Sequence, residues 1–254
     1  MRSLNFNEPH TVFLFIRSFR QITGMKGLVL WLGILLFTVP AYSQKNIEGA
    51  WLFQQDNITH LVMVVPGYYS YAVYTPQQFL HTEGGTWRGF SDTSAIETTS
   101  EFNATDITQV KEKKTDSSFF NRFHFQLQQP ISGWKKLPSP YHDLEAVWRI
   151  SERAQQGEMK TIPDGSRKTI KLIAGDRFLW AAINTATGEF FGAGGGEFSY
   201  TPGSYIEKIR FFSRDNSKAG LELQFNDTIT QEKWDHQGKS SKGDPIHEIW
   251  VRMY

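Results

Sequence analysis

A chain of 254 residues is long enough for one large domain or two small ones, each with a buried core. Its content of 39% hydrophobic and 15% aromatic residues, with only 21% charged, excludes wholesale disorder and a coiled coil. The sequence has no cysteine, which excludes disulfides, thiolate catalysis and cysteine-ligated metal centres. The net charge of +1 provides no basic field that would gather nucleic-acid phosphates.

The N-terminal segment has the pattern of a signal peptide. The apolar run Gly27–Val39 is too short to span a bilayer but has the length of a signal-peptide core. It follows Met25 and Lys26, and the small residues of Ala41–Ser43 come next. The pattern predicts cleavage before Gln44.

Residues 25–43 therefore form the expected signal, and 1–24 are an upstream extension or a long basic region before it. Residues 1–43 hold four basic and one acidic residue, so the remaining chain has 23 basic and 25 acidic residues. We expect export to the periplasm or out of the cell, no nucleic-acid partner and no stable membrane anchor after cleavage. The alternative is an uncleaved signal anchor.

The mature chain consists of short β-rich segments separated by turns rich in Gly, Asn, Asp, Ser and Pro, with little helical periodicity. Such a pattern predicts an all-β fold, an antiparallel sandwich or barrel. The candidate strands, in chain order, are His60–Val65, Tyr68–Tyr74, Gly85–Phe90, Phe123–Gln128, Ala146–Ile150, Thr169–Ile173, Phe178–Asn184, Phe190–Gly195, Tyr205–Ser213, Gly220–Asn226 and Ile246–Met253.

An internal repeat organises these strands. Five segments of the first half recur in the same order in the second, the first three at offsets of 97, 109 and 111 residues. The matches are Ile47–Trp51 with Leu144–Trp148, Tyr69–Tyr74 with Phe178–Ile183, Thr82–Trp87 with Ala193–Phe198, Phe123–Leu127 with Leu221–Phe225, and Trp134 with Trp234. Two copies of one β-meander account for this order better than chance similarity among aromatic strands does.

Each copy is long enough for eight short strands, which predicts two tandem antiparallel β-barrels. We expect the first barrel over 44–140 and the second over 141–254. The seam over Pro140–Arg149 has few Gly or Ser residues, so the barrels should pack closely together.

The second copy resembles the lipocalin-like, calycin-type domains of uncharacterised secreted proteins in Gram-negative bacteria. The resemblance covers 144–254 and lies in the strand ending at Trp148, the stretch from Phe178 through Thr187–Gly196, and the closing His247–Arg252. It implies a closed barrel with an apolar cavity for small hydrophobic ligands such as lipids. The family supplies no agreed catalytic residues.

The aromatic alternation of the second copy supplies the candidate ligand-binding residues. They are Phe178, Trp180, Phe190, Phe198, Phe211 and Trp250. We expect a non-catalytic exported protein that binds a small apolar or amphipathic ligand in a barrel cavity. The alternative is a structural or protein-interaction module of the cell envelope whose barrels are filled by side chains, because an eight-stranded barrel is only just wide enough for one small ligand.

Other patterns do not indicate an enzyme, a metal or a cofactor. Gly194–Gly196 precedes a strand pattern, so it predicts a bulge in a curved wall and not a phosphate loop. The histidines lack metal-ligand spacing, and we expect them at the surface or the barrel rim. Glu83 with Glu97, or Glu197 with Glu207, would serve glycoside hydrolysis only if their strands brought them together, and the solvent face of a barrel is their commoner place.

Overall fold

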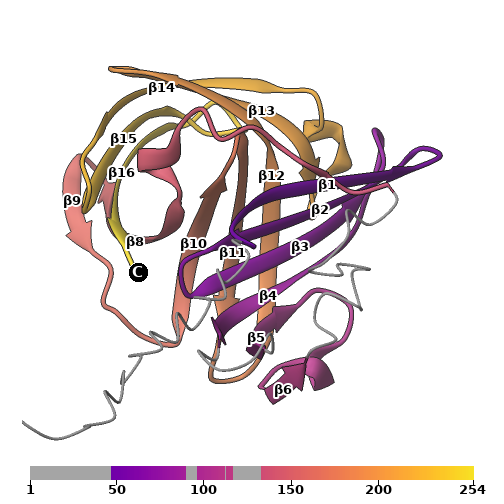
Figure 1. Ribbon diagram of the computed structural model, residues 1–254. Helices are drawn as coiled ribbons and strands as arrows, with labels where there is room; N and C mark the ends of the chain where they lie inside the picture. Colours follow the sequence, from indigo (N-terminus) through magenta and orange to yellow (C-terminus); the bar gives the residue numbers. More distant parts are fainter. Residues whose placement is uncertain (1–46, 90–95, 112, 117–132) are drawn as a thin grey trace, which may run out of the picture. The chain divides into compact units, whose positions relative to one another are not determined.

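The computed structural model describes residues 47–89, 96–111, 113–116 and 133–254, and this part of the chain holds strands and three short 3-10 helices (Figure 1). The predicted all-β class is confirmed. Within it, no helix is long and apolar enough to cross a membrane. The signal-peptide segment and the candidate strand over 123–128 lie outside the described residues.

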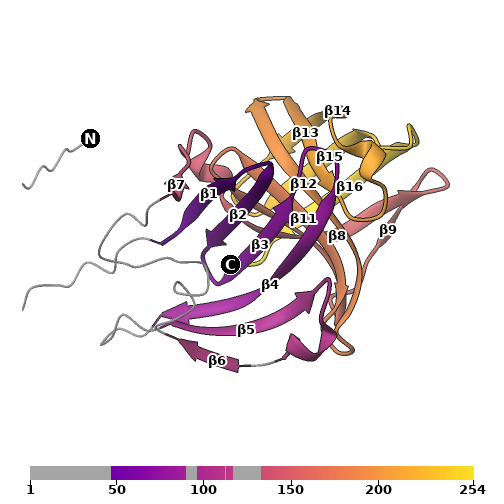
Figure 2. The same ribbon diagram turned by 90° about the vertical axis from the view of Figure 1, so that its right-hand side faces the viewer.

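The first copy forms a seven-stranded sheet in the order β6-β5-β4-β3-β2-β1-β7, which is open within the described residues (Figure 2). Its strands are β1 (Gly49–Gln55), β2 (Ile58–Val65), β3 (Tyr68–Tyr74), β4 (Phe79–Gly89), β5 (Ile96–Asn103), β6 (Lys113–Asp116) and β7 (Lys135–Lys136), with the 3-10 helix η1 (Ile107–Gln109) after β5. The helix η2 (His142–Leu144) lies between the copies.

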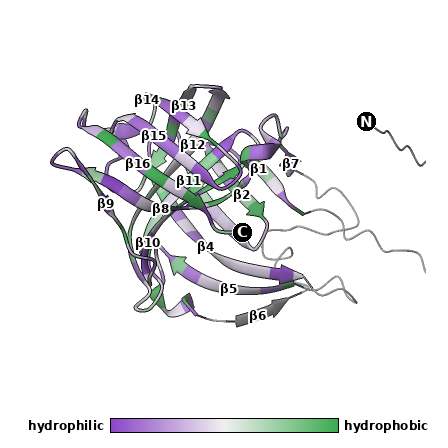
Figure 3. Ribbon diagram, turned by 90° about the vertical axis from the view of Figure 1, so that its left-hand side faces the viewer, coloured by the Kyte–Doolittle hydropathy of each residue, from purple (hydrophilic) through white to green (hydrophobic). Residues whose placement is uncertain are grey.

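The second copy closes into a barrel of eight antiparallel strands, β8 and β10 to β16, because β8 pairs with both β10 and β16. The short strand β9 pairs with the far end of β8. The bounds are β8 (Ala146–Gln155), β9 (Glu158–Thr161), β10 (Arg167–Ala174), β11 (Arg177–Asn184), β12 (Glu189–Thr201), β13 (Ser204–Phe212), η3 (Asn216–Lys218), β14 (Glu222–Ile229), β15 (Lys233–Lys239) and β16 (Pro245–Arg252). More buried and more exposed side chains alternate along β14 and β15, as expected for strands with one face inside a barrel. Figure 3 shows hydrophilic residues along both strands.

The two copies share local structure as well as sequence. At the start of each, a tryptophan indole donates to the carbonyl four residues earlier, Trp51 to Ile47 at 3.0 Å and Trp148 to Leu144 at 3.1 Å. Equivalent aspartates also cap the 3-10 helices, because Asp106 accepts from the amide of Thr108 and Asp215 from that of Ser217.

The strand register corrects two matches of the repeat. Strand β6 pairs with β5 as β14 pairs with β13, so Lys113–Asp116 corresponds to residues 222–225, and the expected match of Phe123–Leu127 with Leu221–Phe225 is wrong. Trp51 lies opposite Lys136, and Trp148 lies opposite Arg252, with each cation over the indole of its partner. Strand β7 of the first copy therefore corresponds to β16, and Trp134 corresponds to Trp250. The expected match of Trp134 with Trp234 is wrong.

Paired glycines build the same bulge in each copy. The register shifts between Gly84 and Gly85 in the first copy and between Gly195 and Gly196 in the second. A Cβ on Gly196 would lie 2.0 Å from the carbonyl oxygen of Lys208, so only glycine fits there. The predicted bulge at the glycine run is confirmed, and its extra residue reverses which face the following side chains occupy.

The outer faces of the two sheets pack against each other in one apolar core. Tyr74 contacts Phe211 with ring centroids 5.0 Å apart, and Phe102 stacks on Phe190 at 6.2 Å. At the border of this core, Lys168 of the second copy forms an ion pair with Glu101 of the first at 3.0 Å, and Glu101 accepts from Tyr68. The members are Ala50, Leu61, Met63, Val65, Tyr68, Ala72, Tyr74, Phe102, Val147, Ile170, Leu172, Ala174, Leu179, Ala181, Ile183, Ala193 and Phe211.

Replacing the bulge glycine tests this packing. Gly196→Ala should lower the free energy of unfolding by about 3 kcal/mol, because the added methyl group overlaps a strand carbonyl that cannot move alone. Gly165→Ala is the matched control, since nothing lies within 4 Å of its new Cβ. Urea unfolding of both variants gives the comparison, and equal midpoints would contradict the role assigned to Gly196.

Candidate functional site

The structure separates the six predicted ligand-binding residues into two groups. Phe178, Trp180, Phe198 and Trp250 lie in the interior of the second barrel. Phe190 and Phe211 lie in the core between the two sheets instead. The reason is a register shift next to each of them, at Ala182/Ile183 for Phe190 and at Gly195/Gly196 for Phe211. Each shift interrupts the alternation of the strand and leaves the phenylalanine on the outer face.

Large side chains pack against one another inside the second barrel. Tyr205 lies 5.2 Å from Phe198 and 5.0 Å from Trp234, and Trp148 makes an edge contact with Trp234 at 5.6 Å. Trp250 is 3% exposed and Phe178 is 0% exposed. These rings contact protein atoms on most of their surface.

The same interior holds a buried ion pair that the strand pattern does not indicate. Lys171 of β10 forms an ion pair with Glu207 of β13 at 2.8 Å, and both side chains are buried, so the solvent face expected for Glu207 is wrong. Glu248 of β16 is also buried, and its partner Arg153, 2.7 Å away, is exposed. Only the closure of the barrel brings Lys171 and Glu207 together inside it.

His236 is also inside the barrel, so its expected place at the surface or rim is wrong. Its Nδ1 lies 3.0 Å from the carboxylate of Asp227, which also accepts from the indole of Trp234 at 2.7 Å. The neighbour Asp235 points outward and lies 3.1 Å from His247. Adjacent residues thus point to opposite faces, as the strand pattern predicts.

Burial sets the protonation of this pair. It raises the pKa of Asp227 from 3.8 to about 7, against the lowering effects of the Trp234 hydrogen bond and Lys171. It lowers the pKa of His236 from 6.5 to about 3, and the charge of Lys171 acts in the same direction. Burial therefore disfavours the charged form of both groups.

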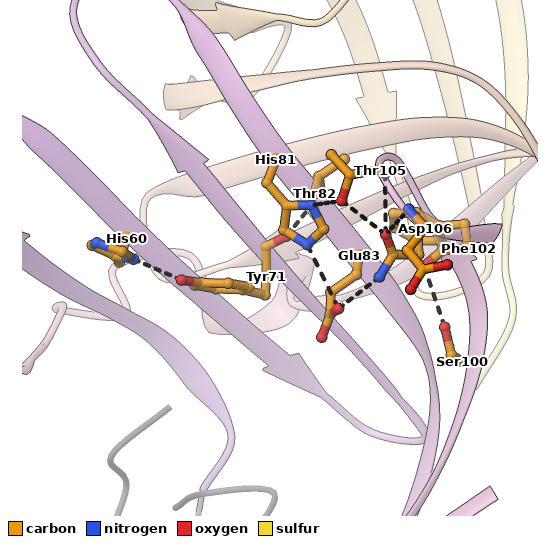
Figure 4. A network of polar contacts seen from close by, with 10 residues as sticks. His60, Tyr71, His81, Thr82, Glu83, Ser100, Phe102, Thr105 and Asp106 are labelled. Carbon is orange, nitrogen blue, oxygen red and sulfur yellow. Dashed lines mark hydrogen bonds and ion pairs between the residues drawn. The ribbon is translucent and has the colours of Figure 1, made fainter. Parts of the chain in front are cut away.

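A second polar group lies on the inner face of the first sheet, where side chains from β2, β3, β4 and β5 meet (Figure 4). His60 Nδ1 and Tyr71 Oη are 2.6 Å apart. His81 contacts the Thr105 hydroxyl at 3.0 Å and lies 3.6 Å from Glu83. We call His60, Tyr71, His81, Glu83, Asn103 and Thr105 the inner-face network.

Asn103 and the turn after β5 fix the geometry of this network. The Asn103 amide donates to Glu83 at 3.0 Å, while its carbonyl oxygen accepts from the backbone amides of Thr105 and Asp106. Burial lowers the pKa of His60, and burial together with Glu83 raises the pKa of Tyr71 to about 12. Both groups are therefore neutral at pH 7.

Five rings form a continuous row across the same face. Trp134 stacks on Phe53 at 5.6 Å, Phe53 lies 5.6 Å from His60, His60 stacks on Tyr71 at 6.0 Å, and Tyr71 meets His81 at 6.1 Å. Each of these residues is half-buried. The row runs from an apolar end at Trp134 to a polar end at His81.

The equivalent place in the second barrel is closed by an apolar plug. The strand register matches Tyr71 with Trp180, Glu83 with Gly194, and Asn103 with Phe212. Trp180 lies against the backbone of Gly194, where a Cβ would be 2.7 Å from its Nε1, and makes an edge contact with Phe212 at 5.4 Å. The first copy thus has polar groups where the second has packed rings.

The two carboxylate pairs that glycoside hydrolysis would need are not formed. Glu97 pairs with Arg88 at 3.0 Å, while Glu83 accepts from Asn103. Glu197 pairs with Arg210 at 2.6 Å, and Glu207 faces Lys171 inside the barrel. Across residues 47–89, 96–111, 113–116 and 133–254, no group of three or more His, Asp or Glu side chains is arranged to hold a metal ion.

Comparisons with known proteins give structural likenesses and no family. No family model matches the chain, and no curated protein matches it. Among solved structures, a redesigned β-barrel aligns with 47% of this chain and all of its own length, at 13% identity and a TM-score of 0.31. The assignment of a barrel to the second copy rests on its closed strand pairing.

The Asp227–His236 pair predicts opposite pH responses in two variants. In Asp227→Asn, the free energy of unfolding should fall as the pH drops below about 6.5. The reason is that the histidine binds a proton in the unfolded chain at that pH, whereas His236 in the folded chain stays neutral down to about pH 3. In His236→Asn, stability should rise as pH drops from about 7 towards 4, because folded Asp227 binds a proton before the unfolded chain does.

Urea unfolding between pH 4.5 and 7.5 measures how the free energy of unfolding changes with pH in each variant. One titrating group can change it by at most about 1.4 kcal/mol per pH unit. The contributions of the two residues largely cancel in the natural chain, so its slope from this pair should be small. Slopes of the same sign in the two variants would contradict the assignment.

Proposed function

We propose that this protein is a non-catalytic binding protein for a small amphipathic ligand, and that the ligand binds on the inner face of the first copy. The observation that carries the proposal is the row of half-buried rings that ends at the inner-face network. The second copy, with its packed interior, acts as the support for this face.

The row suits a ligand with an apolar body and a polar end. Trp134 and Phe53 offer ring surface to the body, and burying apolar area there stabilises a complex by about 25 cal/mol per Å². His60, Tyr71 and His81 supply donors and acceptors for the polar end. The bonds of Asn103 hold this end in place before a ligand arrives, which lowers the entropy cost of binding.

The proposal has two further parts, export of the protein and a barrel fold for the first copy. We propose that residues 25–43 are a signal peptide and that the first copy is a second lipocalin-like barrel. The described strands β1 to β7 have counterparts in β8, β10 to β14 and β16, which supports a shared fold. A mature N-terminus at Gln44, read by mass spectrometry of protein recovered from the periplasm, tests the export part.

A protein-interaction role in the cell envelope is the second candidate. The packed aromatic interior of the second barrel favours it, because a filled barrel leaves the outer surface and loops for function. Under this alternative, substitutions on the inner face would affect the binding of a protein partner and would not affect the binding of a small molecule.

A pair of equivalent substitutions tests the ligand site. With 1-anilinonaphthalene-8-sulfonate as an amphipathic probe, His60→Ala should weaken binding about tenfold, the size expected when one anchor of a small site is removed. Thr169→Ala is the matched control, because Thr169 holds the position of His60 in the second copy. Its affinity should equal that of the natural chain.

A triple variant carries the plug of the second copy into the first. Tyr71→Trp with Glu83→Gly and Asn103→Phe should abolish probe binding while the circular dichroism spectrum stays β-type, since the same three side chains pack together in the second barrel. Fluorescence titration reads the affinity. Equal affinity for the natural chain, His60→Ala and the folded triple variant would overturn the proposed site.

A further inference from the structure

A buried lysine lies at the centre of an aromatic cage in the second barrel. Lys171 Nζ is 4.8 Å from the ring centroid of Trp234, 5.0 Å from that of Trp250 and 5.5 Å from that of Tyr205. Its side chain is 4% exposed. The three rings come from β13, β15 and β16, so closure of the barrel assembles the cage.

The contacts of Lys171 are those of a bound ammonium ion. One carboxylate, that of Glu207, lies 2.8 Å from Nζ and balances the charge. The ring faces attract the rest of the ammonium through their quadrupoles, which is how proteins hold alkylammonium ligands. In a dry interior both contacts are stronger than in water.

The surrounding charges favour a cation at this place. Asp227 and Glu207 face the interior as acids, while the charge of Arg153 is engaged by Glu248 at 2.7 Å. Lys171 lowers the pKa of Asp227, because its positive charge attracts the ionised carboxylate. His236, whose pKa burial lowers to about 3, is neutral at pH 7 and adds no competing cation.

The fold does not require this ion pair. The strand register places Val62 of the first copy where the second has Lys171, and Thr98 where it has Glu207. Val62 and Thr98 are also buried, so the first sheet is built around a valine and a threonine at these positions. The cage is therefore a feature of the second copy and not a consequence of its strand pairing.

Two polar atoms of the cage, Trp250 Nε1 and Tyr205 Oη, are buried without a hydrogen-bond partner in the described part of the chain. The indole Nε1 of Trp250 is buried without a hydrogen-bond acceptor, which costs free energy in a packed core. Packing for stability alone would not select an indole with an unmet donor next to a buried charge. An aromatic cage uses the ring faces, and Trp250 supplies one.

We propose that the second barrel contains a binding site for a primary alkylammonium group, and that the side chain of Lys171 occupies it as a built-in ligand. The site is closed to outside ligands because the chain fills it. Removing the lysine side chain opens a cage that selects an alkylammonium ion over a neutral molecule of the same size. This site is separate from the inner-face network and does not depend on the function proposed for it.

Lys171→Ala in the full chain tests the proposal, with n-propylammonium chloride as the probe, because it replaces the deleted part of the lysine side chain. Urea unfolding should show a lower midpoint than in the natural chain. Propylammonium should restore the midpoint in a concentration-dependent way and bind about tenfold more tightly than 1-propanol, the neutral molecule of matching size. Sodium chloride at equal ionic strength corrects for screening.

Two further samples complete the experiment. The natural chain should not respond to propylammonium, and Lys171→Ala with Glu207→Gln should lose the preference for the ammonium over the alcohol. If Lys171→Ala is unfolded without a probe, folding that depends on propylammonium supports the proposal in the same way. Equal rescue by 1-propanol, or no rescue by propylammonium, overturns it.

Discussion

The apolar core between the two copies is the constraint on which the rest of this structure depends. Strands β2, β3, β10 and β11 bury one face in this core and the other on the inner side of their own sheet. The side chains on both faces must therefore be apolar, or polar with a partner inside the protein. This explains runs such as Leu61–Val65, where five consecutive residues are buried. It also explains why Lys171, in the middle of β10, needs a carboxylate and a ring cage.

The paired glycines allow each sheet to contribute side chains both to its own interior and to the core shared by the two copies. At Gly195 and Gly196 the register shift turns Phe211 from the barrel interior to the shared core, while Ile209 stays inside. Phe102 follows the same shift in the first copy. Because the bulge recurs at equivalent places, the two copies present matching outer faces to each other and keep separate interiors.

Much of the fold follows from the sequence, because alternation and turn residues locate most strands and the ordered matches reveal the duplication. Strands β1, β5, β6, β7, β9 and β15 are not among the predicted strands. In β5 and β15 the reason is a Thr-rich or charged sequence, such as Lys233–Lys239, in which a single buried residue like Trp234 stands among polar ones. The faces of Phe190 and Phe211 could not be predicted from alternation, because a bulge reverses it without a signal in the residue itself.

The repeat itself carries a signal for the inner-face network. His81 and Glu83 stand where the second copy has Gly192 and Gly194. Gly194 leaves room for the ring of Trp180 and Gly192 for the side chain of Arg214, whereas the first copy has polar side chains at both positions. The buried charges of the second barrel had no such signal. Their pairing joins strands far apart in sequence, as Lys171 with Glu207 does, and only the closed barrel brings them together.

The central claim is that ligand binding belongs to the first copy and structural support to the second. Imidazole resonances of the full chain labelled with ¹⁵N-histidine test it directly, because His60 and His81 lie on the inner face and His236 inside the second barrel. On titration with 1-anilinonaphthalene-8-sulfonate, the account predicts that the His60 and His81 signals shift while that of His236 stays fixed. A shift of His236 alone would place the ligand in the second barrel and contradict the account.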